Sequence, residues 1–238
     1  AALENDTLIK NTGVFSARSG WSSDDIWVGF HVDNPLPNAK HGHNDVGMFV
    51  LDAMGENFFL DLGAEDYNIN PYSSAYRIRA EGHNTVVINP DEDYDQRYGS
   101  FASFDKWEMK PRGSFATADL TDVYADYVNS AWRGVKLDNY RRTVTVQDEI
   151  EMKEPSDFYW FAHTMAEIEI ADTVTDIELG AFWDCDSLVS IVIPNSVTAM
   201  ENCFHTKLQS ITLSNNLTKI DQGMFANCTE LTSIVIPE

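Results

Sequence analysis

The chain has 238 residues, a formal net charge of −22 at pH 7, 43% hydrophobic residues and 12% aromatic residues. This composition can form the packed core of one large domain or of two ordinary ones. The charge argues against nucleic acid and anionic membranes as partners, because both require a cationic protein face. The sequence has no run of about 18 apolar residues, so no membrane span is expected.

Residues 13–164 are predicted to be all-β. Short runs rich in β-branched and aromatic residues alternate with turn residues there, a pattern typical of an antiparallel β-sandwich. Met54–Asn57 has the composition of a hairpin turn between two strands. No amphipathic helix of useful length is predicted in this region. The clearest predicted strands are residues 27–32, 47–53, 57–61, 85–89 and 143–146.

The acidic stretch that follows residue 89 is predicted to be a loop. Pro90 cannot donate a strand hydrogen bond, and Asp91–Asp95 is expected to be solvated. Two other polar residues, His31 and His163, are expected to be hydrogen-bonded members of the sandwich rather than ligands.

Three stretches in this region together supply histidines and aspartates. They are His41–Asp45, Phe59–Gly63 and Glu81–Thr85. Residues i and i+2 of a strand point to the same face, so His41 and His43 can reach one site, or one of them can face a cleft. Imidazole and carboxylate together suit Zn²⁺, which favours a metal site built from these stretches. The alternative is that these are unrelated polar residues at strand ends.

Positive residues flank the histidine stretches. Lys40, Arg77 and Arg79 could form a local cationic patch, which an acidic chain would need in order to bind a polyanion. Arg79 and Asn84 are candidate substrate-binding residues for a carboxylate group. The alternative for Arg79 is a surface position on a strand.

After Thr164 the sequence repeats itself with a period of 20 to 23 residues. A fixed period of this length indicates a solenoid, in which each turn buries its apolar face against the next. The four isoleucines at one aligned position are predicted to point inward. The aligned positions are those of Leu188, Leu208 and Leu231, of Phe182, Phe204 and Phe225, and of Ile168, Ile191, Ile211 and Ile234.

The three cysteines, Cys185, Cys203 and Cys228, all lie in the repeating region. An odd count at near-repeat spacing does not indicate a disulfide framework, so we expect small buried apolar residues. The chain stops inside a fourth repeat without a polar capping repeat, and Ala1–Asp6 is not a signal peptide. We therefore expect a fragment of a longer protein, or a chain from which a signal has been removed.

Several motifs of the first region occur in a specific order. They are His41–Phe49, Leu60–Gly63, Arg79–Thr85, Ala118–Thr121, Tyr140–Thr143, Gln147–Ile150 and Tyr159–Thr164. In this order they resemble the C-terminal β-sandwich of the heparinase II/III-like polysaccharide lyases over about residues 10–168. The second region resembles the BspA-type leucine-rich repeats of bacterial surface proteins. The expected fold class is all-β, with an antiparallel β-sandwich domain at residues 1–164 and a short leucine-rich-repeat solenoid at residues 165–238.

The lyase resemblance implies roles for individual residues. It implies that His41 is the catalytic residue facing the substrate cleft, and that His43, Asp61 and His83 hold a structural zinc ion. The family's catalytic tyrosine comes from an α/α-toroid domain before the sandwich, which these 238 residues do not include. The isolated chain is therefore expected to be a poor lyase.

The resemblance also implies a function. The first hypothesis is part of a secreted or cell-surface lyase that cleaves uronate-containing acidic polysaccharides by β-elimination. The second is a non-catalytic glycan-binding or adhesive bacterial surface protein. A third is a structural fragment in which zinc only stabilises the fold.

Overall fold

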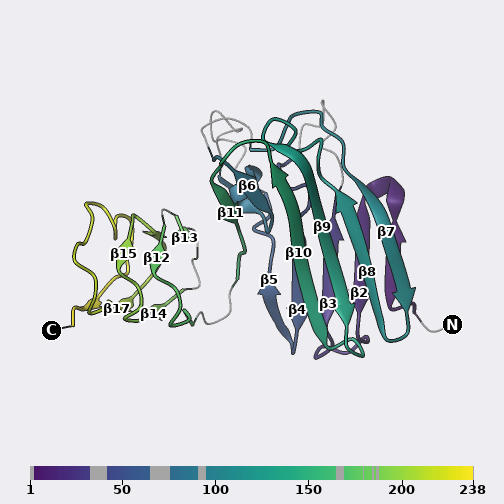
Figure 1. Cartoon of the computed structure of the whole chain (residues 1–238). Coiled ribbons are helices and arrows are strands. Elements are labelled where there is room, and N and C mark those ends of the chain that lie inside the picture. Colours follow the sequence, from purple (N-terminus) through teal and green to yellow (C-terminus); the bar gives the residue numbers. More distant parts are fainter. Residues whose placement is uncertain are drawn as a thin grey trace. The chain divides into compact units, whose positions relative to one another are not determined.

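The computed structural model shows an all-β chain, as the sequence predicted. In the part of the chain that the structure describes, its strands are joined by loops and by the short 3₁₀ helices η1 (Lys10–Thr12), η3 (Tyr76–Ile78) and η4 (Ala80–Gly82). The chain divides into two compact units, Ala1–Thr164 and Met165–Glu238 (Figure 1). The structure describes residues 3–32, 42–64, 76–90, 95–164, 169–178, 180–183, 185 and 188–237.

The first sheet of the first unit is an antiparallel sheet in which each strand pairs with the next one along the chain. The β4–β5 hairpin turns through Met54 and Gly55, whose φ angles of 55° and 81° are left-handed. Two such residues are typical of the tight turns that join twisted strands, and the predicted hairpin is confirmed. The sheet contains β1 (Asp6–Ile9), β2 (Val14–Arg18), β3 (Trp27–His31), β4 (Phe49–Ala53) and β5 (Glu56–Phe59), in that order.

The second sheet is also antiparallel and has the order β10-β9-β8-β7. Its strands are β7 (Ser103–Lys110), β8 (Gly113–Asp119), β9 (Val128–Asp138) and β10 (Thr143–Met152). Burial alternates along β8 and β9, so successive side chains point toward the core and toward solvent. The strand predicted at residues 143–146 extends further than expected. The polar stretch Gln147–Glu151 is also extended, because it pairs with β9.

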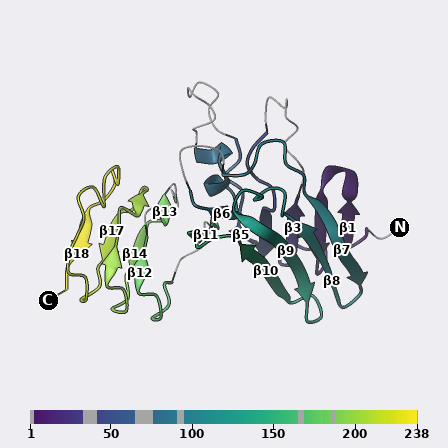
Figure 2. The ribbon, with the colours of Figure 1, turned by 45° about the horizontal axis from the view of Figure 1, so that its top comes forward.

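The hydrophobic core of this unit lies between the two sheets. Figures 1 and 2 show β1–β5 in one layer and β7–β10 in the other. Large aromatic side chains such as Phe15 and Phe30 face small ones such as Ala116 and Ala118, and all four are at most 1% exposed. A short antiparallel pair, β6 (Val86–Ile88) with β11 (Phe158–Trp160), completes the unit.

The second unit is built from short parallel strands. β12 (Asp176–Ile177) pairs with β15 (Ala199–Met200), and β13 (Phe182–Trp183) pairs with β16 (Phe204–His205). β14 (Ser190–Val192), β17 (Ser210–Thr212) and β18 (Ser233–Val235) form a third parallel ladder. Its register places Ile191 beside Ile211 and Ile211 beside Ile234, which confirms the alignment of the repeats.

Equivalent side chains of successive repeats stack in the core of this unit. The rings of Phe182 and Phe204 lie 5.1 Å apart, and those of Phe204 and Phe225 lie 5.7 Å apart. Cys203 and Cys228 are buried free thiols, as predicted, and burial raises the pKa of Cys203 to about 12.

One inward position was predicted wrongly. Ile191 and Ile211 are 4% and 1% exposed, whereas Ile234 is 43% exposed. Ile234 lies on β18, which pairs with β17 alone, so one side of this strand is uncovered among the described residues. The fourth predicted isoleucine, Ile168, lies outside the described residues.

Candidate histidine and carboxylate site

His83 and Asp61 form the centre of the candidate site. Asp61 follows the end of β5, and His83 follows η4. The Nδ1 atom of His83 lies 2.5 Å from Oδ2 of Asp61, and the His83 side chain is only 1% exposed. Oδ1 of Asp61 accepts the Gly63 N–H at 2.8 Å. Burial would raise the pKa of Asp61, but the hydrogen bond and charge of His83 outweigh it and hold that pKa below its ordinary value.

The second ring nitrogen of His83 is an unusual buried atom. An ionised Asp61 can only accept, so Nδ1 of His83 carries a hydrogen, and in a neutral ring the Nε2 atom bears a lone pair. Among the residues that the structure describes, Nε2 is buried without a hydrogen-bond partner. An unpaired buried acceptor is costly, which makes this atom a natural position for a ligand.

Three further titratable residues surround this pair. The ring of His43 lies 5.2 Å from the ring of His83, centroid to centroid. Burial raises the pKa of Asp45, although the charges of His83, His31 and His43 oppose that shift. Nδ1 of His31 lies 3.9 Å from Asp45 Oδ2 and is buried without a hydrogen-bond partner among the described residues. His31 is thus part of the cluster and not the satisfied sandwich residue that was predicted.

Asn84 braces the strands around the site. Its Nδ2 donates to the carbonyl oxygens of Phe49 at 2.8 Å and Leu60 at 3.0 Å. Its Oδ1 accepts the backbone N–H of His163 at 2.6 Å, and the residue is 1% exposed. Nε2 of His163 in turn donates to the Glu81 carbonyl at 2.9 Å, which confirms the predicted hydrogen-bonded role of this histidine. Burial lowers the pKa of His163 to about 4.

Arg79 is held between two carboxylates. Its Nη2 lies 2.8 Å from Glu81 Oε1 and 2.9 Å from Asp95 Oδ1. Burial, together with the hydrogen bond and charge of Asp95, raises the pKa of Glu81 to about 8. Asp95 is 5% exposed, so the prediction of a solvated acidic loop is wrong at this residue, because its carboxylate is needed by the half-buried arginine.

A buried arginine ties the second sheet to these loops. The Arg133 side chain is fully buried, and its Nη1 donates to the carbonyl oxygens of Gly47 at 2.8 Å and Asn84 at 3.2 Å. Sequence reasoning missed Arg133, because a single arginine in an alternating strand has no local signal of burial. Sequence reasoning included Asp45 in the His41–Asp45 stretch without giving it a role, and it did not place His31 in the cluster.

The predicted site residues are therefore only partly brought together. His43, Asp61 and His83 lie near one another, whereas Arg79 and Asn84 are occupied by protein partners in this structure. A contact of these two residues with substrate stays a prediction. The predicted catalytic residue His41, and Lys40 of the predicted cationic patch, lie outside the described residues.

The cluster has the residue types of a zinc site but the spacing of a hydrogen-bonded pair. Two ligands on a tetrahedral zinc ion, each about 2.0–2.1 Å from it, lie roughly 3.3 Å apart. Asp61 and His83 are closer than this, at 2.5 Å. Within the described ranges, no three His, Cys, Asp or Glu side chains converge as a metal ion requires. The unpaired Nε2 of His83 is the observation that favours an additional ligand.

Comparison with known sequences identifies the repeats. Residues 143–238 match the profile of the BspA type leucine-rich repeat region, in six copies. This match begins inside β10, yet β10 pairs with β9 along its length, from Thr143 beside Asp138 to Met152 beside Val128. Residues 143–164 therefore belong to the sandwich in space, and the parallel repeats follow them. No curated protein sequence matches the chain.

Comparison with solved structures identifies the fold of the sandwich. A mutant of heparan sulfate lyase HepC from Pedobacter heparinus matches with a TM-score of 0.55 and 21% identity, over 66% of this chain and 24% of that one. A heparinase III gene product matches with a TM-score of 0.57 and 17% identity, over 71% of this chain and 26% of that one. A further heparinase III matches with a TM-score of 0.52 and 17% identity.

These likenesses establish a polysaccharide-lyase-related fold for the sandwich. The chain spans about a quarter of the length of the heparinase structures that it matches. Among the described residues, no helix is long and apolar enough to span a membrane.

Proposed function

We propose that this chain is the sandwich portion of a lyase for uronate-containing acidic glycans, joined to surface-type leucine-rich repeats. The observation that carries the proposal is the His43–Asp61–His83 cluster, which lies on a sandwich with the fold of the heparinases. One of those heparinases is described as acting on heparan sulfate. An acidic polysaccharide is accordingly the proposed substrate class.

The proposed reaction is a β-elimination. A base removes the proton next to the uronate carboxylate, the C–O bond to the leaving sugar breaks, a C=C bond forms, and an acid protonates the leaving oxygen. The proton becomes acidic enough only when the carboxylate charge is neutralised. The lyase resemblance leads us to assign this neutralising role to His41. His41 lies outside the described residues, one position before Gly42.

The cluster of His83, Asn84 and Arg133 has a positioning role in this proposal. His83 is fixed by Asp61, Asn84 is fixed by three backbone groups, and Arg133 holds the carbonyls of Gly47 and Asn84. Side chains locked in this way keep a nearby loop in one geometry, which is worth a large share of catalytic rate.

A structural zinc ion is a further part of the proposal. His43, Asp61 and His83 would hold it, once the direct Asp61–His83 hydrogen bond gives way. The direct contact of His83 with Asp61, together with the nearby ring of His43, supports this assignment. The ion would stabilise the loops and would take no part in the elimination.

The 238 residues are proposed to be a poor lyase without further sequence. The resemblance assigns the catalytic tyrosine to a toroid domain that these residues do not include. Loss of the main acid–base group removes a rate factor of about 10²–10⁴. Loss of substrate positioning removes more.

The second candidate function is glycan binding or adhesion at a bacterial surface without catalysis. The match of residues 143–238 to BspA-type repeats favours it, because such repeats are typical of bacterial surface proteins. A secreted or surface location is common to both candidates. The two differ only in whether a glycan is cleaved.

The test compares binding and cleavage on the same samples. The chain is mixed with heparan sulfate, chondroitin or alginate, and the ultraviolet absorbance of the unsaturated uronate product is recorded beside the binding affinity. We expect weak binding with little product, and a loss of binding in His41→Ala. Ser23→Ala, in the exposed loop between β2 and β3, is the matched control.

Two results would contradict parts of this proposal. Rapid product release by the chain alone, abolished in His41→Ala, would show that the sandwich holds a complete active site. Absence of binding to all three acidic glycans would contradict an acidic glycan as the substrate class.

A further inference from the structure

The outer face of the β7–β10 sheet carries a hollow of about 410 Å³. This volume lies within the range of small-ligand sites, about 300–1,000 Å³. Its lining residues belong to four neighbouring strands, β7 to β10. Burial alternates along β9, so Trp132, Gly134 and Lys136 share the face of the sheet that is turned away from the core. The strand register puts Gly134 of β9 between Thr117 of β8 and Gln147 of β10, which makes Gly134 the floor of the hollow.

Gly134 is not required by the backbone of β9. Its φ is not left-handed, and the pairing of β9 with β8 and β10 is regular on both sides of it. A Cβ atom built on Gly134 would lie 3.3 Å from Thr117 Cγ2 and would otherwise meet only a backbone oxygen at 3.9 Å. Glycine weakens a strand, and inside a regular strand it marks a place where another molecule approaches closely.

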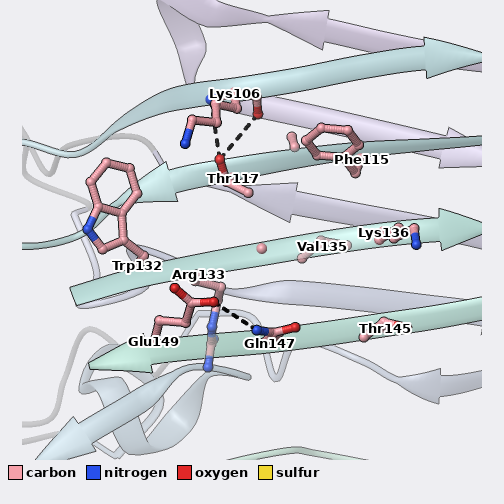
Figure 3. A pocket seen from close by; sticks show the side chains of 12 residues that line it. Lys106, Phe115, Thr117, Trp132, Arg133, Val135, Lys136, Thr145, Gln147 and Glu149 are labelled. Carbon is pink, nitrogen blue, oxygen red and sulfur yellow. Dashed lines mark hydrogen bonds between the residues drawn. The ribbon is translucent and has the colours of Figure 1, made fainter. Parts of the chain in front are cut away.

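The ends of the hollow are aromatic. Figure 3 shows Trp132 at one end, and Phe115 with Lys136 at the other. Trp132 precedes the floor residue by two positions, and two positions of a strand span about 6.6–6.8 Å. Phe115 pairs with Lys136, two positions beyond the floor residue, so the two aromatic rings lie on the order of 13 Å apart along the strands. Such a span leaves room for sugar rings, whose C–H faces pack on aromatic side chains.

Polar groups line one side of the same hollow. The amide of Gln147 donates to Glu149 Oε1 at 3.0 Å, which leaves the other lone pairs of that carboxylate and the Gln147 oxygen as acceptors. These groups suit the hydroxyls of a sugar. An aromatic wall with a few fixed polar groups is the usual composition of a small-molecule site.

The lysine side chains that line the hollow already form ion pairs with aspartates of the protein. Nζ of Lys106 lies 3.8 Å from Asp105, and Lys136 forms an ion pair with Asp138. Glu149 adds a further negative charge to the lining. A sulfated or uronate-rich chain would therefore meet no uncompensated positive charge here. The binding of an uncharged sugar chain does not depend on such a charge.

We propose that this hollow is a binding site for a neutral oligosaccharide, separate from the histidine cluster. The sugar rings would pack against Trp132 and Phe115 across the floor at Gly134. Their hydroxyls would bond to Gln147 and Glu149. The site would let the sandwich hold neutral glycan next to the acidic one proposed as substrate, and it does not depend on that proposed function.

The experiment measures binding of the full chain to four neutral probes by isothermal titration calorimetry. The probes are cellohexaose, xylohexaose, mannohexaose and laminarihexaose, and a heparan sulfate oligosaccharide is the acidic comparison. Gly134→Val places a side chain on the floor of the hollow and raises the β-strand propensity at this position. Trp132→Ala removes the aromatic ring at one end of the hollow. Ser130→Val, on the same face of β9 but outside the hollow, is the matched control. Competition by an excess of the acidic oligosaccharide tests independence from the histidine cluster.

We expect at least one neutral probe to bind, with little dependence on salt. Gly134→Val and Trp132→Ala should each weaken that binding about tenfold or more, which corresponds to about 1.4 kcal/mol. Ser130→Val should leave it unchanged, and an excess of the acidic oligosaccharide should not displace the neutral probe. The proposal is overturned if no neutral probe binds, if Gly134→Val binds as the parent does, or if only the acidic chain binds in a salt-sensitive manner. Displacement of the neutral probe by the acidic oligosaccharide would overturn the separateness of the site.

Discussion

Asp148 receives the buried guanidinium of Arg133 through two hydrogen bonds, Nε to Oδ1 at 2.7 Å and Nη2 to Oδ2 at 2.9 Å. Removing one partner of a buried ion pair leaves the other charge uncompensated, at a cost of about 3–5 kcal/mol. We therefore expect Asp148→Ala to lower the free energy of unfolding of the sandwich by about that amount. Urea denaturation followed by tryptophan fluorescence measures it.

The matched control for this pair lies on the surface of the same sheet. Glu108 and Lys110 form an ion pair at 2.7 Å, but their side chains are 47% and 63% exposed. Exposed pairs contribute about 0–1 kcal/mol, so Glu108→Gln should have little effect. An equal loss of the free energy of unfolding in both variants would show that the burial of Arg133 does not determine the effect of Asp148→Ala.

The zinc proposal predicts metal content in the purified chain. After expression with zinc, elemental analysis should find close to one equivalent, because a single closed site is expected. His83→Ala should lose the metal and lower the melting temperature in the presence of zinc, whereas His163→Gln should keep it. Transition metal at background level in the parent chain would contradict the proposal without reference to activity.

The repeats predict a contrast between two adjacent residues of β14. Ile191 is 4% exposed in the stacked core and Val192 is 66% exposed. Ile191→Asp buries an unpaired charge and should destabilise the second unit by about 4 kcal/mol or more. Val192→Asp should change stability by less than about 0.5 kcal/mol. Calorimetric melting of the two variants distinguishes them, and equal melting would contradict the solenoid packing.

His163 predicts an acid sensitivity of the sandwich. Its pKa is about 4 in the folded chain, because burial disfavours the charged ring, against 6.5 as the ordinary value. Between these values the unfolded chain binds the extra proton, so stability is retained above about pH 6.5 and falls as the pH decreases toward 4. The difference in pKa corresponds to at most about 3 kcal/mol.

His163→Gln isolates this effect from other titrating groups such as Glu81. Glutamine can still donate to the Glu81 carbonyl but does not titrate. Its stability relative to the parent should therefore rise between pH 7 and pH 4.5 in urea titrations. A pH-independent difference between the two chains would show that His163 is not kept neutral by burial.

Local sequence patterns were enough for the fold class and for the repeats. Alternating apolar runs predict strands such as β3 and β4, because the period of two is a property of the extended backbone itself. The recurrence of Ile191 and Ile211 predicts parallel stacking, because each repeat can bury its apolar face only against the next. The histidine and aspartate stretches suggested a shared site, and the lyase resemblance implied that His43, Asp61 and His83 are its members.

Tertiary structure alone decided what those residues touch. The contacts of Arg133 with Asp148 and Asn84, and of Arg79 with Asp95, join residues 15 to 49 positions apart. The hollow at Gly134 depends on which residues of β8 and β10 lie beside it. Such partners follow from the register and packing of whole sheets, and from the loss of water around buried charges, neither of which leaves a local pattern in the sequence.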